Sequence, residues 1–329
     1  MRIPFVDRID EIEYLSELAS KGSPFPLFIY GPEGCGKTRL LEELRDLLKD
    51  RGFLVMYLDA KESDLSRALR GSSRELMDAV ISAVGSLEGV LGKVIALALT
   101  KVIDVYEHRY RFRGKKVVIM VDEVVESIGL SDIERYAKVL HDLARDVVEE
   151  FDAESILVVA TTSEGMSREV LSRHSYLHLS YLWNLREEAF EELARALRAP
   201  KDLISELYAL TSGNPRALID IAARSWRIDS WLDALYAERI RPLRYERIVL
   251  EHLEDLENVV EDPDSATGID PGLRRLLIER NLVTYLGNPL TPRTKPKPSR
   301  EIGVGEEFAW QLNAYRVLIR DRLLPKMRR

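Results

Sequence analysis

The chain has 329 residues and a net charge of −7; 31% of its residues are charged and 46% are apolar. This composition excludes a disordered chain and is typical of a soluble globular protein, and the length predicts two or three domains. The acidic total argues against a protein that coats nucleic acid over its whole surface, so a nucleic-acid contact would need a local basic patch.

Three features bear on the cellular compartment. The first fifteen residues, MRIPFVDRIDEIEYL, carry charges throughout, unlike a signal peptide. Cys35 is the only cysteine, which excludes an internal disulfide. The longest apolar run, residues 84–106, is interrupted by Glu88, Lys93 and Lys101, which favours a buried or partner-facing helix over a membrane span. We therefore expect a cytoplasmic protein without a membrane segment.

Apolar runs in the first half of the chain predict five β-strands, at residues 26–30, 53–59, 116–122, 155–162 and 175–180. The first four are nearly continuous runs rich in Val, Ile and Leu, as expected of strands buried on both faces of a parallel sheet. Helical patterns separate them, such as RLLEELRDLL after the first strand and DIERYAKVLHDLARDVVEEF before the fourth. This alternation predicts a doubly wound α/β domain over residues 1–184.

Helices dominate from residue 185 onward. Residues 185–199, 201–213 and 215–226 predict three short helices and therefore a small helical domain over 185–241. The next helices are predicted at 244–256 and 270–283. A strand pair at 282–287 and 300–304 is expected to flank a long tip. Helices followed by such a hairpin predict a winged-helix domain over 242–329.

The stretch GPEGCGKT follows the first strand and precedes a helix, which is the context of a phosphate-binding loop. Its glycines let backbone N–H groups approach phosphate oxygens. We expect Lys37 to place its charge on the β- and γ-phosphates and the Thr38 hydroxyl to ligate Mg²⁺. The expected nucleotide-binding residues here are Gly31, Pro32, Glu33, Gly34, Cys35, Gly36, Lys37, Thr38 and Arg39.

The strand VVIMVDE ends in two carboxylates, Asp122 and Glu123. An acid at the carboxyl end of a parallel strand faces the crevice where ligands bind. We expect Asp122 to hold the Mg²⁺ ion through water and Glu123 to activate the attacking water. The adjacent glutamate favours hydrolysis over transfer to a small acceptor and argues against a small-molecule kinase.

Together, these motifs resemble the archaeal P-loop ATPases, which belong with the AAA+ and STAND ATPases and are similar to archaeal replication-initiator ATPases. The resemblance covers roughly residues 3–300 by motif order. It implies a P-loop parallel-sheet core, a helical lid, and ATP or ADP with Mg²⁺ as cofactors. In the opening segment PFVDRIDEIEYL, it implies that the backbone around Val6 and Arg8 packs against adenine. Asp7 occupies the position where the family usually has glycine.

Two arginines and a strand end extend the resemblance. VVATTSEG resembles the sensor-1 position, with Thr162 or Ser163 as the polar contact to the γ-phosphate or the attacking water; a plain strand end is the alternative. Arg173 matches an arginine that reaches a phosphate in its own or a neighbouring subunit. Arg168 is the second choice, and a surface salt bridge is the alternative for either arginine.

The segment TSGNPRAL resembles both the Gly-x-Pro motif of STAND ATPases and the sensor-2 motif of initiator ATPases. The resemblance implies that Pro215 touches adenine and Arg216 the γ-phosphate. A capped helix–turn–helix also accounts for Gly213 and Pro215, but it does not account for the arginine.

Basic side chains gather in the last part of the chain. The residues expected to contact DNA, through a candidate recognition helix and an extended hairpin tip at 291–300, are Arg274, Arg275, Arg293, Lys295, Lys297 and Arg300. The acidic stretch 251–266 lies in the same domain, and winged helices also bind proteins. A second basic stretch, residues 108–116, interleaves aromatic residues with arginines and is interpreted as a solvated strand edge rather than a base-stacking surface.

The sequence thus predicts an ATP-binding and ATP-hydrolysing switch whose nucleotide state controls a C-terminal winged helix that contacts DNA or a protein partner. The alternative is a STAND-type signalling ATPase whose winged helix serves only protein assembly. A homo-oligomer is compatible with both. Gln311 is the only glutamine, and such a scarcity of heat-labile amides indicates a thermophilic source.

Overall fold

The α/β half of the molecule is built on one sheet. The computed structural model describes residues 3–62, 65–84, 95–123, 129–162 and 165–327. The strands are β1 Leu27–Tyr30, β2 Leu54–Asp59, β3 Leu69–Gly71, β4 Lys116–Asp122, β5 Ser155–Thr162 and β6 His178–Tyr181. They lie in the order β3-β2-β4-β5-β1-β6, and all neighbours are parallel except β2 and β3. The first four predicted strands are confirmed. The fifth starts later than predicted, and the short edge strand β3 was not predicted.

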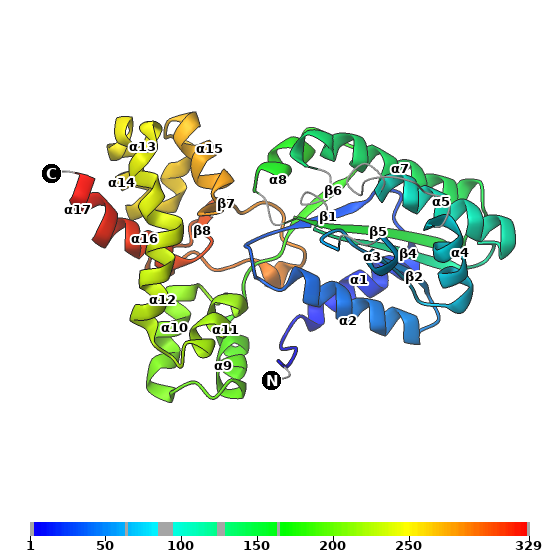
Figure 1. Cartoon of the computed structure of the whole chain (residues 1–329), viewed down its shortest axis with the longest axis horizontal. Coiled ribbons are helices and arrows are strands. Elements are labelled where there is room, and N and C mark those ends of the chain that lie inside the picture. Colours follow the sequence, from blue (N-terminus) through cyan, green and yellow to red (C-terminus); the bar gives the residue numbers. More distant parts are fainter. Residues whose placement is uncertain (1–2, 63–64, 85–94, 124–128, 163–164, 328–329) are drawn as a thin grey trace.

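Helices cover both faces of this sheet (Figure 1). On one face lie α1 Ile9–Lys21 and α2 Lys37–Asp50, which bury Leu15, Leu40 and Leu44 against the strands. The opposite face carries α4 Arg74–Val84, α5 Ile95–Arg109 and α7 Ile133–Glu149, while α3 Leu65–Ala68 and α8 Gly165–Leu171 flank the strand ends. Apolar cover on both faces explains why the central strands are continuous apolar runs. Within the described ranges, every helix is too short or too polar to span a bilayer.

The second half is mainly helical. Its elements are α9 Glu187–Ala196, α10 Ile204–Thr211, α11 Pro215–Ala223, α12 Ile228–Leu235, α13 Arg247–Glu251, α14 Leu253–Glu261, α15 Pro271–Glu279, β7 Val283–Tyr285, β8 Phe308–Trp310, α16 Asn313–Leu318 and α17 Leu324–Met327. Two π-helical turns, Tyr236–Ile240 and Ile319–Leu323, extend α12 and α16. One hydrophobic cluster runs through all of these parts and includes Phe190, Trp310 and Leu324. The regions predicted as a lid and a winged helix therefore share one core.

The predicted hairpin is wrong in its second strand. β7 pairs antiparallel with β8, Phe308–Trp310, whereas Arg300–Ile302 forms a 3-10 turn. The Asp264 carboxylate accepts hydrogen bonds from the backbone N–H groups of residues 306–308 and so fixes the start of β8. Tertiary contacts therefore select the later segment as the strand.

The basic segment 291–300 is not a projecting tip, contrary to the prediction. Just before it, residues 288–290 hydrogen-bond to Tyr181 at the open edge of β6 and so extend the sheet. Thr294 is buried, with its hydroxyl 3.3 Å from the Glu11 carboxylate in α1, and Arg293 forms an ion pair with Asp10 at 3.0 Å. The segment is therefore docked on the α/β half.

Candidate nucleotide-binding site

The phosphate loop follows β1 and leads into α2, as predicted. A Cβ atom on Gly31 would lie 2.1 Å from the Leu182 carbonyl oxygen, and one on Gly34 would lie 2.5 Å from the Cβ of Arg216. Gly36 has φ 105° and caps α2. The Leu182 backbone at the first position, the Arg216 side chain at the second and a left-handed backbone at the third exclude larger residues, so the structure itself requires this glycine spacing.

Lys37 lies inside the loop. Its side chain is buried, and Nζ donates to the carbonyl oxygens of Gly31 at 3.0 Å and Pro32 at 3.2 Å. These two carbonyls hold the ammonium group inside the loop. Cys35 is also buried, and its carbonyl accepts a hydrogen bond from Arg8.

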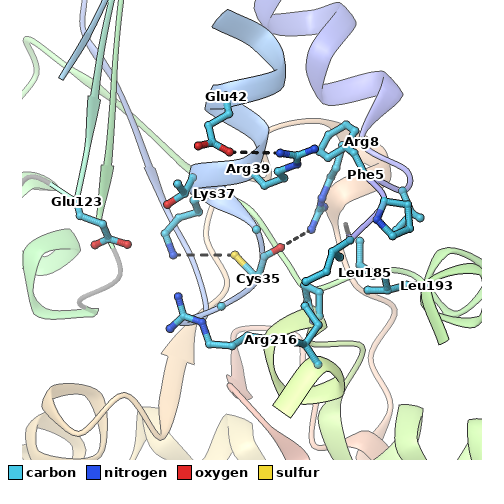
Figure 2. Close-up of a pocket in the computed structure, with 18 residues that line it drawn as sticks. Phe5, Arg8, Cys35, Lys37, Arg39, Glu42, Glu123, Leu185, Leu193 and Arg216 are labelled. Atoms are coloured by element: carbon cyan, nitrogen blue, oxygen red, sulfur yellow. Dashed lines mark hydrogen bonds and ion pairs between the residues drawn. The ribbon is translucent and has the colours of Figure 1, made fainter. Parts of the chain in front are cut away.

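A cavity of about 530 Å³ opens beside the loop (Figure 2). This volume lies within the usual range of small-molecule sites. One end is apolar and the other, around Lys37 and Glu123, is polar. The lining residues are Ile3, Pro4, Phe5, Val6, Arg8, Gly34, Cys35, Gly36, Lys37, Thr38, Arg39, Glu42, Glu123, Leu185, Leu193, Pro215, Arg216 and Ile219.

The acidic pair ends β4, as predicted, but its two members differ. Asp122 is buried and accepts hydrogen bonds from the Tyr57 hydroxyl at 3.2 Å and the Thr161 hydroxyl at 2.5 Å. Burial, together with the charge of Asp122, raises the pKa of Tyr57 far above its usual value, so this hydroxyl stays a donor. Glu123 has φ 54° and lines the cavity, with its carboxylate 3.9 Å from Lys61 Nζ. Such a backbone conformation in a non-glycine residue is common at functional sites.

The opening segment borders the same cavity. Val6 and Arg8 line it, but the Arg8 guanidinium donates to the carbonyl oxygens of Cys35 at 3.1 Å and Trp183 at 2.5 Å. Arg8 therefore ties the phosphate loop to the segment that follows β6, and its charge is directed at protein groups. Asp7 has φ 58°, which explains why glycine suits this position.

Across the cavity, α11 brings its first turn to the loop. The Asn214 side chain caps α11, Pro215 is its first residue, and Gly213 packs against the Leu185 carbonyl with no room for a Cβ. The structure therefore contains the capped turn that the sequence analysis gave as the alternative explanation of Gly213 and Pro215. Arg216 and Pro215 also line the cavity, so the turn places both predicted contacts there. The Arg216 guanidinium forms an ion pair with Glu33 at 2.8 Å.

Other predicted residues lie outside the cavity lining. The Thr162 hydroxyl is buried and lies 2.8 Å from the Ser167 hydroxyl, and Ser163 lies outside the described residues. Arg173 is exposed just after α8. The Arg168 guanidinium lies 3.9 Å from the centre of the Tyr285 ring, so it joins α8 to β7. The remaining predicted residues outside the lining are Gly31, Pro32, Glu33 and Asp122.

Several lining residues were not predicted. Phe5 belonged to the apolar pair of the opening motif and gave a usable signal. Leu185, Leu193 and Ile219 sit in amphipathic helical segments, where an apolar residue is indistinguishable from core. Ile3, Pro4 and Glu42 complete the set.

The C-terminal basic residues mostly have partners within the chain. Arg275 pairs with Glu279 at 2.6 Å, Lys295 with Glu306 at 3.8 Å, and Arg300 with Asp262 at 2.7 Å. Arg274 donates to the carbonyl of Thr267, whereas Lys297 is exposed and has no ion pair among the described residues.

In the stretch 108–116, Phe112 is buried and the Tyr110 hydroxyl bonds Asp78. These aromatic rings thus belong to the packing between α4, α5 and β4. Residues 110–115 form a turn between α5 and β4 rather than the predicted strand edge, and the buried Phe112 ring is unavailable for stacking on a base.

The chain is similar to a known protein sequence, to solved structures and to the model of a protein family. An uncharacterized ATP-binding protein of Pyrococcus abyssi is 23% identical over 286 residues, covering 79% of this chain and 86% of the relative. The Aeropyrum pernix ORC1 protein, solved in complex with DNA, is 16% identical with a TM-score of 0.46, covering 99% of this chain and 95% of that one. The Aeropyrum pernix ORC2 protein is 17% identical with a TM-score of 0.44, covering 100% and 97%. The model of a family described as an ATPase domain predominantly from Archaea matches residues 5–221, which span the loop, the acidic pair and the first turn of α11, and the chain therefore belongs to this family.

Proposed function

We propose that this chain is an ATP-driven switch. It binds ATP with Mg²⁺, hydrolyses ATP to ADP and phosphate, and passes the nucleotide state to residues 242–329, which contact DNA or a protein partner. One observation carries the proposal: Lys37 and Glu123 come from the α/β half, Pro215 and Arg216 from the helical half, and all four line one cavity. A nucleotide bound there touches both halves.

Each polar residue has a chemical role in this proposal. Lys37 turns from the carbonyls of its own loop to the β- and γ-phosphates. The Thr38 hydroxyl would ligate Mg²⁺ and Asp122 would hold the ion through water, and the ion would neutralise charge on the phosphate oxygens. Glu123 orients and deprotonates the attacking water. Arg216 contacts the γ-phosphate, so the position of the helical half depends on that group.

Two further residues have roles that depend on a larger assembly or on closure. Arg173 is exposed, which suits contact with a nucleotide in a neighbouring copy of the chain. Thr162 reaches the site only if its contact with Ser167 opens. In this proposal residues 1–184 carry the chemistry, residues 185–241 act as the lid, and residues 242–329 deliver the output.

A second candidate function keeps the ATPase and changes the partner. Most of the cations expected at DNA are paired with acids of the same chain, such as Arg293 with Asp10 and Arg300 with Asp262. This pairing favours a STAND-type ATPase whose C-terminal part assembles with protein.

Steady-state ATP hydrolysis, measured with no DNA, with duplex DNA and with single-stranded DNA, distinguishes the two. It should be run at room temperature and hot, because the amide-poor composition indicates a thermophilic source. Stimulation by DNA supports the first function. A hydrolysis rate that does not change when DNA is added supports the second function. Absence of ATP binding overturns both functions.

A further inference from the structure

The tip of the phosphate loop faces the helical half. The Glu33 carboxylate accepts from Arg216 Nη1 on Oε1 at 2.8 Å and from Arg239 Nη2 on Oε2 at 2.7 Å. Its backbone N–H donates to Gln311 Oε1 at 3.0 Å, and its backbone carbonyl accepts from the Asn214 side chain at 2.9 Å. All four polar groups of this loop residue therefore contact residues 214–311.

Arg239 connects this tip to the C-terminal core. It lies in the π-helical turn Tyr236–Ile240, and such wide turns are frequent at functional sites. Its guanidinium also lies close enough to the hydroxyl of Tyr315, a buried residue of α16, for its positive charge to act on that group. Arg239 therefore stands between Glu33 and the buried Tyr315 side chain. A displacement of Glu33 is passed through Arg239 to the packed centre of the C-terminal half.

The charges at the tip are unbalanced. Two guanidinium groups share one carboxylate, and they repel each other across it. The side chains of Arg216, Arg239 and Glu33 are 59%, 39% and 40% exposed, so each ion pair is weak enough to exchange partners. Arg216 also lines the cavity, where the terminal phosphate of ATP competes for it with a larger negative charge.

We propose that Glu33 is a positioning residue that holds Arg216 while the terminal phosphate is absent, and that reports the arrival of this phosphate to α16 through Arg239. The inference rests on the proposed function, since it takes Arg216 as the γ-phosphate sensor. When Arg216 moves to the phosphate, Glu33 keeps Arg239 alone, the repulsion between the two guanidinium groups ends, and the contact from the loop to Arg239 tightens. The tighter contact to Arg239 offsets part of the free energy lost when the Glu33–Arg216 pair breaks, and the remainder lowers the affinity for ATP.

A double-mutant cycle tests the competition for Arg216. Glu33→Gln, Arg216→Ala and the double variant are made in a Glu123→Gln background, which prevents turnover, and titrated with Mg²⁺-ATP and Mg²⁺-ADP by calorimetry. Glu33→Gln is expected to raise ATP affinity about two- to fivefold and to leave ADP affinity unchanged. This factor corresponds to the free energy of an exposed ion pair. In the Arg216→Ala background the same change should have no effect.

Glu279→Gln is the matched control. It removes an ion pair to Arg275 at 2.6 Å with a similarly exposed glutamate, 41%, away from the loop. If Arg216→Ala loses no ATP affinity, the sensor role in the proposed function fails. If Arg216→Ala weakens ATP binding but Glu33→Gln leaves it unchanged or weakens it as well, only the role of Glu33 is overturned.

Hydrogen exchange tests the relay to the C-terminal half. At saturating nucleotide, the amides of α16, Asn313–Leu318, are expected to exchange several-fold more slowly with ATP than with ADP in the Glu123→Gln protein. Adding Glu33→Gln or Arg239→Ala should abolish this difference, whereas Glu279→Gln should retain it. Equal exchange with both nucleotides in the background protein overturns the relay, as does a difference that survives Glu33→Gln.

Discussion

The two walls of the cavity differ in how firmly their charged groups are held. On the wall from the α/β half, Lys37 and Glu123 are no more than 6% exposed. The Lys37 ammonium donates to two loop carbonyls, and the Glu123 backbone N–H donates to the Thr161 hydroxyl. On the other wall, the Arg216 side chain is 59% exposed and paired with Glu33, which is itself 40% exposed. Buried, hydrogen-bonded groups are preorganised, whereas exposed pairs exchange partners cheaply.

In the proposed function, this difference separates two tasks. The fixed wall suits chemistry, because catalytic groups lose rate when their geometry varies. The exposed wall suits sensing, because its arginine has an alternative partner within the protein. Substitutions on the fixed wall should therefore have the larger effects, and those on the exposed wall should discriminate between nucleotides.

Lys37→Ala is expected to have the largest effect, which is loss of ATP binding. The loop then lacks its cation for the terminal phosphates, and within the described structure no other side chain donates a hydrogen bond to the carbonyls of Gly31 and Pro32. Binding is measured by calorimetry with Mg²⁺ present. Lys49→Ala, an exposed lysine near the end of the same helix, is the control. Near-parental ATP affinity in Lys37→Ala contradicts a phosphate-binding loop.

Glu123→Gln should bind ATP but hydrolyse it about 10²–10⁴-fold more slowly, the usual loss when a general base is removed. The amide keeps the size of the side chain and cannot accept a proton from water. Phosphate release and ATP affinity are both measured, with Glu154→Gln as the control at the amino-terminal end of the strands, away from Glu123. Unchanged turnover means that another group activates the water.

Arg216→Ala tests the exposed wall. Loss of a charge-assisted hydrogen bond of about 1.5–3 kcal/mol predicts a tenfold or larger loss of ATP affinity, with ADP affected less because it lacks the γ-phosphate. Arg224→Ala is the control, since Arg224 ends the same helix and lies outside the cavity lining. The titrations are done in the Glu123→Gln background. If Arg216→Ala and the parent bind ATP with equal affinity, Arg216 does not contact the γ-phosphate, and Pro215 serves only to start the helix.

Sequence reasoning succeeded where local chemistry dictates geometry. Each glycine of the phosphate loop is required by a neighbour or by its backbone angle, so the motif alone specifies strand, loop and helix. It failed where distant contacts decide. The second strand of the C-terminal pair was placed at 300–304, because nothing in that stretch reveals that Asp264 fixes residues 306–308 instead.

The roles of single charged residues were the hardest to predict. Glu33 was expected to bind nucleotide as a member of the loop, yet its partners Arg216 and Arg239 lie 183 and 206 residues away in sequence. Arg293 was read from local charge as a DNA contact, whereas Asp10 neutralises it across the fold. A single sequence carries no signal for such pairings.

The Asp264 carboxylate is intermediate between the two walls in exposure. It is half-buried and accepts hydrogen bonds from three backbone N–H groups. Burial alone raises its pKa, but these donors and the charge of Arg300 outweigh it and lower the pKa. Its contribution to stability is therefore complete above about pH 4, the ordinary range of the unfolded carboxyl, and is lost as the pH falls through the lower native value. Asp264→Asn should cost about 1–2 kcal/mol at pH 7 and progressively less below pH 4.

Urea unfolding at several pH values measures this change. Glu254→Gln is the control, because it removes one exposed charge from α14, the helix that precedes Asp264. A cost for Asp264→Asn that is the same at pH 7 and pH 3 would mean that the carboxylate charge is not what fixes β8.

The smallest expected effect concerns the docked basic segment and compares Arg293 with Lys297. Arg293 pairs with Asp10, so a DNA phosphate must displace that acid and gains little net charge. Lys297 is exposed without an ion pair among the described residues, so it releases a counterion if it meets DNA. If the segment binds duplex DNA as proposed, Lys297→Ala should lower the slope of log K against log salt by about 0.9, whereas Arg293→Ala should change it much less. Equal losses of slope would show that Arg293 leaves Asp10 on binding, and no loss in either variant would exclude the segment from the DNA contact. Both variants should unfold within about 1 kcal/mol of the parent, since each removes only an exposed charge.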